Sequence, residues 1–310
     1  MPLTVSLMAS GLTQPVLDGT IAHPDLDLSL RTGSVDDNTR GMLSGAFDAA
    51  EMSMATFVQA RTRGVDFVAL PIFLGRRFLQ SCVAFALAAP YSAGELRGKR
   101  IALPQYWMTS SMWHRGLLEH EYGVPATEVE WVTTQPERLD VGFTPGVRVT
   151  TVADRPLPAL LADGSVDVIF PPRPPARDGT LAFLFDDPIE ASLDYLKRTG
   201  VYPLLHTIVV RGDRMRERPA LGAALYDLFT RAKDYAYAHP EKTEIESPIA
   251  GLTFEEVRER LGDPYPFGVR ANAAAIDAFL GYAVEQGLTA ERLSRDEAFA
   301  DPGSPLVRNP

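Results

Sequence analysis

The sequence has one cysteine, no excess of positive charge and no long apolar run, and each shortage excludes a class of protein. Cys82 has no partner for an internal disulfide, so the fold does not depend on a disulfide framework. Thirty basic side chains against forty acidic ones leave a net charge of −10, which opposes binding to nucleic acid or to an anionic membrane. Because of this negative charge, an anionic ligand would need a local cationic pocket. A transmembrane helix needs about eighteen apolar residues in a row, and no such run is present.

Motifs for nucleotides, metals and serine hydrolysis are also missing. No G-x-G-x-x-G follows an expected strand, and residues 94–99 (GELRGK) have too few residues between their glycines for a P-loop. His120 and Glu121 lack the second histidine of a zincin, and the five histidines have no zinc-ligand spacing. The sequence therefore predicts no metal and no other cofactor. Its N-terminus lacks the basic and apolar regions of an export signal, which predicts a cytoplasmic protein.

The residues that are present are typical of a globular α/β protein. A chain of 310 residues with 45% hydrophobic side chains can build one large domain or two ordinary ones. Apolar or alternating runs predict strands at 3–9, 25–30, 67–72, 83–88, 99–103, 128–133, 147–151, 166–170 and 204–211, and residues 47–53 supply a further short strand. Helical spacing predicts helices at 38–47, 54–63, 109–122, 157–162, 194–198, 220–238, 253–261, 271–286 and 295–300. This succession predicts a mostly parallel sheet that binds ligands beyond the carboxyl ends of its strands.

Seven segments along the chain are distinctive when they are taken together. They are 51–55 (EMSMA), 70–73 (LPIF), 96–106 (LRGKRIALPQY), 198–203 (RTGVYP), 206–211 (HTIVVR), 266–269 (PFGV) and 285–288 (EQGL). In this order and spacing they resemble the 4,5-dihydroxyphthalate decarboxylase family over nearly the whole chain. The resemblance implies an α/β, two-lobed fold like that of type II periplasmic binding proteins, with a ligand cleft between the lobes. We expect lobe one to comprise 1–103 and 211–310, and lobe two to comprise 104–210.

The resemblance implies a cofactor-independent decarboxylase of a hydroxylated aromatic acid, 4,5-dihydroxyphthalate or a related compound. Its partners would be a small aromatic carboxylate and other copies of the chain in a homo-oligomer, with no nucleic acid and no membrane. Two alternatives stay open. One is a solute-binding protein for an aromatic carboxylate in ABC-type uptake, and the other is a lyase like those of the menaquinone pathway.

The expected chemistry requires an acid near the ring and a cation for the carboxylate that is retained. An aryl anion is unstable, so the carbon that loses carbon dioxide must receive a proton first. We predict that His206 donates it, because its ordinary pKa is near neutrality, and the alternative is a core histidine bonded to the backbone. Glu51 is either a protonated acid held by desolvation or an ordinary acid at a helix start. Arg76 is the expected carboxylate anchor and Arg173, on a proline-rich loop, is the second, because a guanidinium binds a carboxylate bidentately. The alternatives are a solvated surface arginine for Arg76 and a surface salt bridge for Arg173.

Further residues complete the expected substrate site. Seven side chains are candidate substrate contacts: Ser53, Phe73, Tyr106, Trp107, Thr109, Ser110 and Thr207. One hydroxyl among residues 109–111 is also expected to cap the helix that begins there. We expect Arg77, His114 and His120 at the surface and Trp113 in the core.

The chain also departs from the family pattern. Residues 10–14 (SGLTQ) lack an expected arginine, Gln80 stands where a histidine is expected, and Trp107 replaces a smaller residue. A related but different aromatic acid is therefore open as the substrate.

Overall fold

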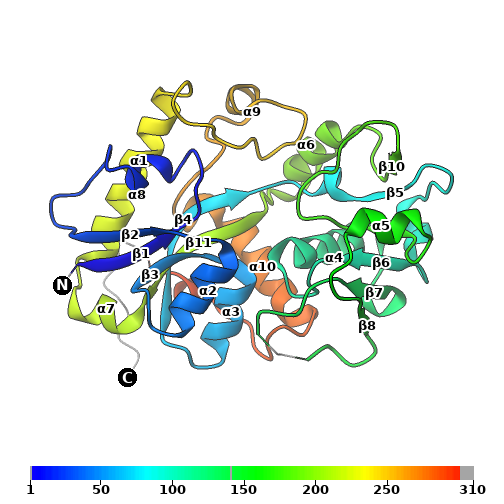
Figure 1. Cartoon of the computed structure of the whole chain (residues 1–310), viewed down its shortest axis with the longest axis horizontal. Coiled ribbons are helices and arrows are strands. Elements are labelled where there is room, and N and C mark those ends of the chain that lie inside the picture. The colour runs from blue at the N-terminus through cyan, green and yellow to red at the C-terminus, as the bar shows by residue number, and fades with distance from the viewer. Residues whose placement is uncertain (1, 140–141, 301–310) are drawn as a thin grey trace.

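Two mixed β-sheets form the framework of two α/β lobes. The structure is a computed structural model that describes residues 2–139 and 142–300. The strand order is β2-β1-β3-β11-β4 in the first sheet and β10-β5-β9-β6-β7-β8 in the second, and Figure 1 shows the sheets side by side. The strands are β1 (Leu3–Leu7), β2 (Leu28–Thr32), β3 (Ala49–Ser53), β4 (Phe67–Arg76), β5 (Ala84–Ala86), β6 (Arg100–Leu103), β7 (Glu130–Thr133), β8 (Arg148–Thr151), β9 (Val168–Ile169), β10 (Leu181–Phe183) and β11 (Leu204–Arg211).

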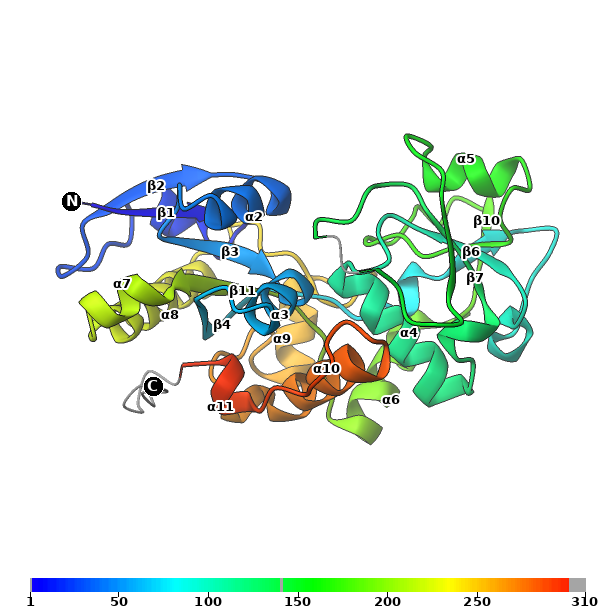
Figure 2. The ribbon, with the colours of Figure 1, turned by 90° about the horizontal axis from the view of Figure 1, so that it is seen from below.

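Helices cover both sheets and fill the space beneath their junction. They are α1 (Gln14–Leu17), α2 (Val35–Leu43), α3 (Met54–Thr62), α4 (Thr109–Tyr122), α5 (Leu157–Ala162), α6 (Pro188–Thr199), α7 (Gly212–Glu217), α8 (Leu221–Ala238), α9 (Phe254–Leu261), α10 (Ala273–Glu285) and α11 (Arg295–Ala298). In Figure 2, α10 lies below the first sheet and extends toward α4 of the second lobe, and the two helices are in contact. The predicted two-lobed α/β fold is confirmed.

The sheets do not divide the chain where the sequence predicted the lobe boundaries. We expected changes of lobe at 103/104 and 210/211, yet β6 belongs to the second sheet and β11 to the first. The chain leaves the first sheet after Arg76 and returns at Leu204. Since β11 runs antiparallel to β3 and β4, the first sheet is mixed rather than nearly all parallel. Strand pairing, which local sequence does not encode, decides this division.

The predicted helices and strands agree with the structure better than the predicted lobe boundaries do, and the remaining differences have local causes. Helix α4 has the predicted bounds, but its N-cap is Met108 without a side-chain bond, so the expected hydroxyl cap is wrong. Helix α6 is longer than predicted because Asp187 caps it, accepting from the amides of Ile189 and Glu190, and Pro188 occupies its first turn. The sequence analysis missed β10, α1 and α7, which are six residues or shorter.

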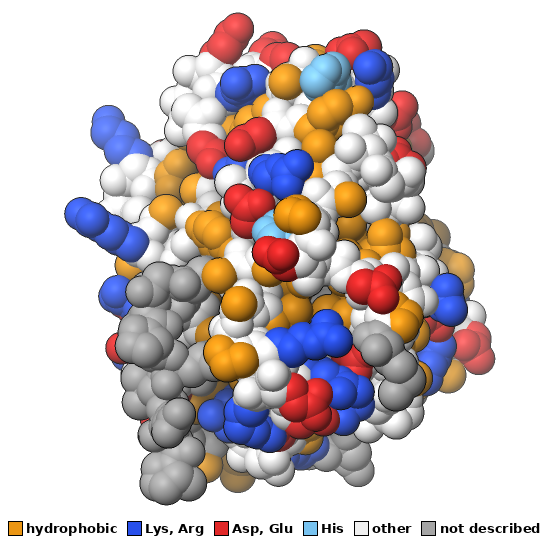
Figure 3. Space-filling view, turned by 90° about the vertical axis from the view of Figure 1, so that its left-hand side faces the viewer, with side chains coloured by type: hydrophobic (Ala, Val, Ile, Leu, Met, Phe, Trp, Pro, Cys, Tyr) orange, Lys and Arg blue, Asp and Glu red, His pale blue; other side chains and the backbone are white. Residues whose placement is uncertain are grey.

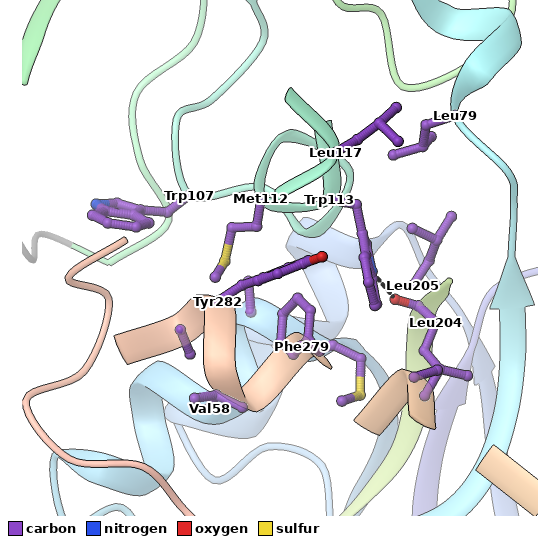
Figure 4. Close-up of a cluster of buried hydrophobic side chains, with 14 of the residues drawn as sticks. Val58, Leu79, Trp107, Met112, Trp113, Leu117, Leu204, Leu205, Phe279 and Tyr282 are labelled. Atoms are coloured by element: carbon purple, nitrogen blue, oxygen red, sulfur yellow. Dashed lines mark hydrogen bonds between the residues drawn. The ribbon is translucent and has the colours of Figure 1, made fainter. Parts of the chain in front are cut away.

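An apolar cluster under the cleft joins the two lobes. Trp113 of α4 packs against Phe279 and Tyr282 of α10, and its indole donates to the Leu204 carbonyl of β11 at 2.8 Å. Figure 4 shows these side chains packed between α4, α10 and β11. The core position predicted for Trp113 is confirmed. Cys82 is buried as well, and burial raises the pKa of its thiol to about 11, as expected for a packing residue.

Charges on the outer face of the first lobe are balanced locally. Arg211 pairs with Asp213 at 2.5 Å, Arg214 with Asp48 at 2.7 Å, and Arg216 with Asp66 at 2.6 Å. Figure 3 shows this mixture of basic and acidic side chains in the lower part of that face. Exposed pairs of this kind contribute about 0–1 kcal/mol each, so they control surface charge more than stability.

His114 contradicts the expectation of a surface residue. It is 1% exposed and stacks on Phe170 with ring centroids 4.6 Å apart. Burial lowers the pKa of His114 to about 3, so the ring is neutral in the folded protein near neutral pH. His120, on another face of the same helix, is exposed as predicted and contacts Glu285 at 2.7 Å.

His114→Phe should make the protein less sensitive to acid. Between its ordinary pKa of 6.5 and about 3, the unfolded chain binds a proton that the folded chain does not. Stability is therefore highest above pH 6.5 and falls as the pH decreases toward 3. From about pH 7 to pH 5, the wild type should lose about 2 kcal/mol more unfolding free energy than the variant, measured in urea. An equal loss in the wild type and the variant would contradict a buried, neutral His114.

Candidate functional site

His206 lies where β11 passes between the ends of β3 and β4. It pairs with Ser53 on one side and Gly75 on the other. On the β4 side the register jumps, because His206 opposes Gly75 while Ile208 opposes Leu70. Pro71 has no amide hydrogen for the ladder, so β4 leaves the regular pairing there and bulges before it rejoins β11. The bulge interrupts the sheet beside the imidazole.

Glu51 and His206 form a contact across the two strands. The Nδ1 atom of His206 lies 3.2 Å from Oε1 of Glu51, and the amide of Met8 donates to Oε2 at 3.1 Å. The Glu51 side chain is 4% exposed and that of His206 is 21% exposed. Glu51 sits on β3 rather than at a helix start, and both of its carboxyl oxygens are in hydrogen-bond contact. The contact orients the imidazole and leaves Nε2 as the ring nitrogen that it does not use.

One cavity of about 390 Å³ brings together residues from strand ends of both lobes. It includes four predicted site residues, Glu51, Arg76, Arg173 and His206, which are far apart in the sequence. Its lining is Met8, Ala9, Ser10, Gly11, Leu12, Glu51, Leu74, Gly75, Arg76, Arg77, Arg173, Leu205, His206, Glu244, Ile245, Glu246 and Tyr265. Three guanidiniums and three carboxyl groups therefore gather in this cavity.

Arg76 is buried and is held by neutral oxygen atoms. Its guanidinium donates to the carbonyls of Tyr202 (3.2 Å) and Pro266 (3.1 Å), and to Asn272 Oδ1. Burial lowers its pKa to about 10, which leaves it positively charged at neutral pH. Its Nε has no hydrogen-bond partner among residues 2–139 and 142–300.

Arg77 and Arg173 share one carboxylate at the wall of the cavity. Arg77 donates to Oε1 of Glu246, and Arg173 Nη1 donates to the same oxygen at 2.6 Å. The Arg77 side chain is 8% exposed, so the expectation of a solvated Arg77 is wrong. Arg77 follows β4 directly, and it also donates to the Pro172 carbonyl at 2.7 Å.

Seven other predicted contacts lie outside the lining of this cavity: Ser53, Phe73, Tyr106, Trp107, Thr109, Ser110 and Thr207. The hydroxyl of Ser53 bonds that of Thr109 at 2.7 Å, where β3 meets α4. Thr207 donates to the Leu70 carbonyl at 2.6 Å, and Phe73 packs edge-on against Phe299. The hydroxyls of Ser53, Thr109 and Thr207 are thus engaged in hydrogen bonds within the protein.

The Tyr106 region forms a separate buried cluster in the second lobe. The guanidinium of Arg115 lies 3.7 Å from the centre of the Tyr106 ring. The amides of Tyr106 and Trp107 donate to the carboxylate of Glu137 at 2.6 and 3.1 Å. Ser110 is buried in the first turn of α4. An internal carboxylate, that of Glu137, therefore occupies these two amides.

Sequence reasoning missed Glu246, Tyr265 and the Met8 amide. Glu246 lies between α8 and α9 in a segment without a motif, and its backbone carbonyl accepts from the Tyr265 hydroxyl at 2.7 Å.

Within the described part of the chain, no three His, Cys, Asp or Glu side chains are grouped as metal ligands. No helix in those same ranges combines the length and apolar character needed to cross a bilayer.

Comparison with curated proteins agrees with the resemblance seen in the sequence. A 4,5-dihydroxyphthalate decarboxylase from Comamonas testosteroni is 28% identical over 304 residues, which cover 92% of each chain. The chain resembles the 4,5-dihydroxyphthalate decarboxylases. A protein of the same name from Pseudomonas putida is 25% identical, over 59% of this chain and 77% of its own. No family model matches the sequence.

Solved structures confirm the predicted fold. The periplasmic aliphatic sulphonate binding protein SsuA from Escherichia coli superposes with a TM-score of 0.60 at 13% identity, covering 97% of this chain and 92% of that one. A Candida albicans protein described as having the generic periplasmic binding protein fold gives a TM-score of 0.55 at 15% identity, covering 96% and 93%. At this identity the likeness concerns the fold alone.

Gly11→Ala should destabilise the wall of the cavity. A Cβ at Gly11 would lie 2.6 Å from backbone atoms of Glu244, which cannot rotate away as a side chain can. We expect a loss of about 1–3 kcal/mol in the free energy of unfolding, measured by urea titration. Gly94→Ala is the control, because its Cβ would meet nothing within 4 Å. Equal stability of the two variants would contradict this packing.

Proposed function

We propose that the chain is a non-oxidative decarboxylase of a hydroxylated aromatic dicarboxylate, with 4,5-dihydroxyphthalate or a closely related acid as substrate. Its similarity to two curated decarboxylases supports the reaction class. The observation that carries the proposal is the His206–Glu51 contact inside a cavity that also contains three arginines. An acid that can protonate a ring thus stands beside groups that can bind carboxylates. Homo-oligomer formation stays a prediction.

In the proposed reaction, His206 protonates the ring carbon that carries the departing carboxylate. A new C–H bond forms, and a ring hydroxyl donates electron density to the cationic ring. The C–C bond to the carboxylate then breaks, carbon dioxide leaves, and the electron pair of that bond restores aromaticity. His206 regains its proton from solvent. No oxidant or reductant is consumed, because the net change replaces a carboxylate by a hydrogen atom.

The other charged residues divide the remaining tasks. Glu51 acts as a positioning residue that accepts a hydrogen bond from Nδ1 of His206. Nε2 is then the ring nitrogen that donates the proton to the substrate. Arg77 and Arg173 bind the carboxylate that is retained, because both already hold a carboxylate oxygen. Arg76, which lines the same cavity, adds a third positive charge.

Purified, chelator-treated protein should convert 4,5-dihydroxyphthalate into carbon dioxide and the monoacid in equal amounts. Phthalate without hydroxyl groups should not react, because nothing donates electron density to its protonated ring. Trapped carbon dioxide and liquid chromatography of the aromatic product measure both. Tight binding without turnover across a panel of hydroxylated phthalates would contradict the proposal and favour a solute-binding protein.

His206→Gln should lower kcat by about 10²–10⁴-fold, because the variant lacks the proton donor. The dissociation constant for phthalate, measured by calorimetry, should change little, since the arginines remain. His120→Gln is the matched control, because it removes an exposed histidine that contacts Glu285 on another face of the protein. Equal activity of the two variants would exclude His206 as the donor.

A further inference from the structure

Glu246 occupies the position in the cavity that suits a ligand carboxylate. We propose that Arg77 and Arg173 form the subsite for the retained carboxylate of an aromatic dicarboxylate, and that Glu246 fills this subsite until the ligand displaces it. The inference rests on the proposed function for the class of ligand. Both guanidiniums donate to the same Glu246 oxygen, Oε1, which is the arrangement that a bound carboxylate would adopt.

The three residues come from separate parts of the fold. Arg77 follows β4, Arg173 lies on the loop after β9 in the second lobe, and Glu246 belongs to the connection between α8 and α9. The subsite therefore forms only where the two lobes meet. Its occupant contacts both lobes, as a ligand in the cleft would.

Arg77 is held more firmly than the carboxylate that it shares with Arg173. The Arg77 side chain is almost fully buried, and the Pro172 carbonyl accepts one of its hydrogen bonds. Four of the five residues from 171 to 175 are prolines, which stiffen the loop that carries Arg173. The Glu246 side chain is 46% exposed, while its backbone carbonyl is fixed by the Tyr265 hydroxyl. Rotation of the side chain alone would thus release the carboxylate to solvent.

Competition with Glu246 lowers the affinity of the subsite for any carboxylate that enters it. An incoming carboxylate must break two charge-assisted bonds before it forms equivalent ones. A dianion can offset this cost with its second charge, because Arg76 lines the same cavity. After decarboxylation the monoacid loses that contribution, and the return of Glu246 favours its release. Glu246 thereby selects dicarboxylates and assists turnover.

Calorimetric titration with phthalate tests this role without any catalytic step. Glu246→Gln should lower the dissociation constant by about tenfold or more, because the amide is a weaker competitor for the guanidiniums. Glu246→Asp keeps the charge but shortens the side chain, so it should give an intermediate value. Glu244→Gln is the matched control, since it removes the same charge from the same cavity wall and should change the constant less than threefold. A Glu246→Gln constant that is unchanged or weaker would overturn the inference.

A second background tests whether the effect passes through the arginines. Arg173 is 66% exposed, so Arg173→Gln should fold normally, which a thermal melt verifies. In this background the gain from Glu246→Gln should largely disappear, whereas an undiminished gain would overturn the inference.

Failure of the inference and failure of the proposed function give different results. If phthalate binding depends on Glu246 but no hydroxylated phthalate releases carbon dioxide, the subsite stands and the decarboxylase proposal fails. If carbon dioxide is released but Glu246→Gln binds phthalate no better than Glu244→Gln, the decarboxylase stands and the displacement model fails.

Discussion

β11 enters the first sheet between β3 and β4 after the chain has built the whole second lobe, and it runs antiparallel to both neighbours. This insertion places His206 on the same strand pair as Glu51, although 155 positions separate them in the sequence. It also forces β4 to accommodate Pro71, which cannot donate to the ladder, through a bulge beside the imidazole. The acid, its acceptor and the adjacent cavity therefore all depend on the register of one returning strand.

The lobes are joined by two kinds of contact that serve different purposes. Below the cleft, Trp113 and its aromatic neighbours bury apolar area between α4, α10 and β11. Other links between the lobes are polar: Arg138 pairs with Asp36, and Arg173 pairs with Glu246 at the cavity. Apolar burial provides a stable junction, whereas partly exposed ion pairs cost little to exchange. Such an arrangement lets a ligand replace polar contacts without disturbing the core.

The charge distribution explains how an acidic protein can receive an acidic molecule. Surface arginines, such as those of α7, are paired with neighbouring carboxylates. In the cavity, Arg76 is held by neutral oxygens, and Arg77 and Arg173 share a single carboxylate. The lining thus holds three guanidiniums and three carboxylates, a neutral balance inside a chain whose net charge is −10. Desolvation of Arg76 and Arg77 makes these charges more effective than exposed ones.

The sequence by itself determined the α/β class, most strands and long helices, the burial of Trp113 and four residues of the cavity, because these follow from periodicity, residue chemistry and the family resemblance. It could not determine the sheet to which β6 and β11 belong, since pairing between distant strands leaves no local pattern. Nor could it show that the hydroxyls of Thr207 and Ser53 make hydrogen bonds inside the protein, or that Arg77 is buried. The role of Glu246 was decided only by the tertiary structure, because the two arginines that define it approach from different lobes.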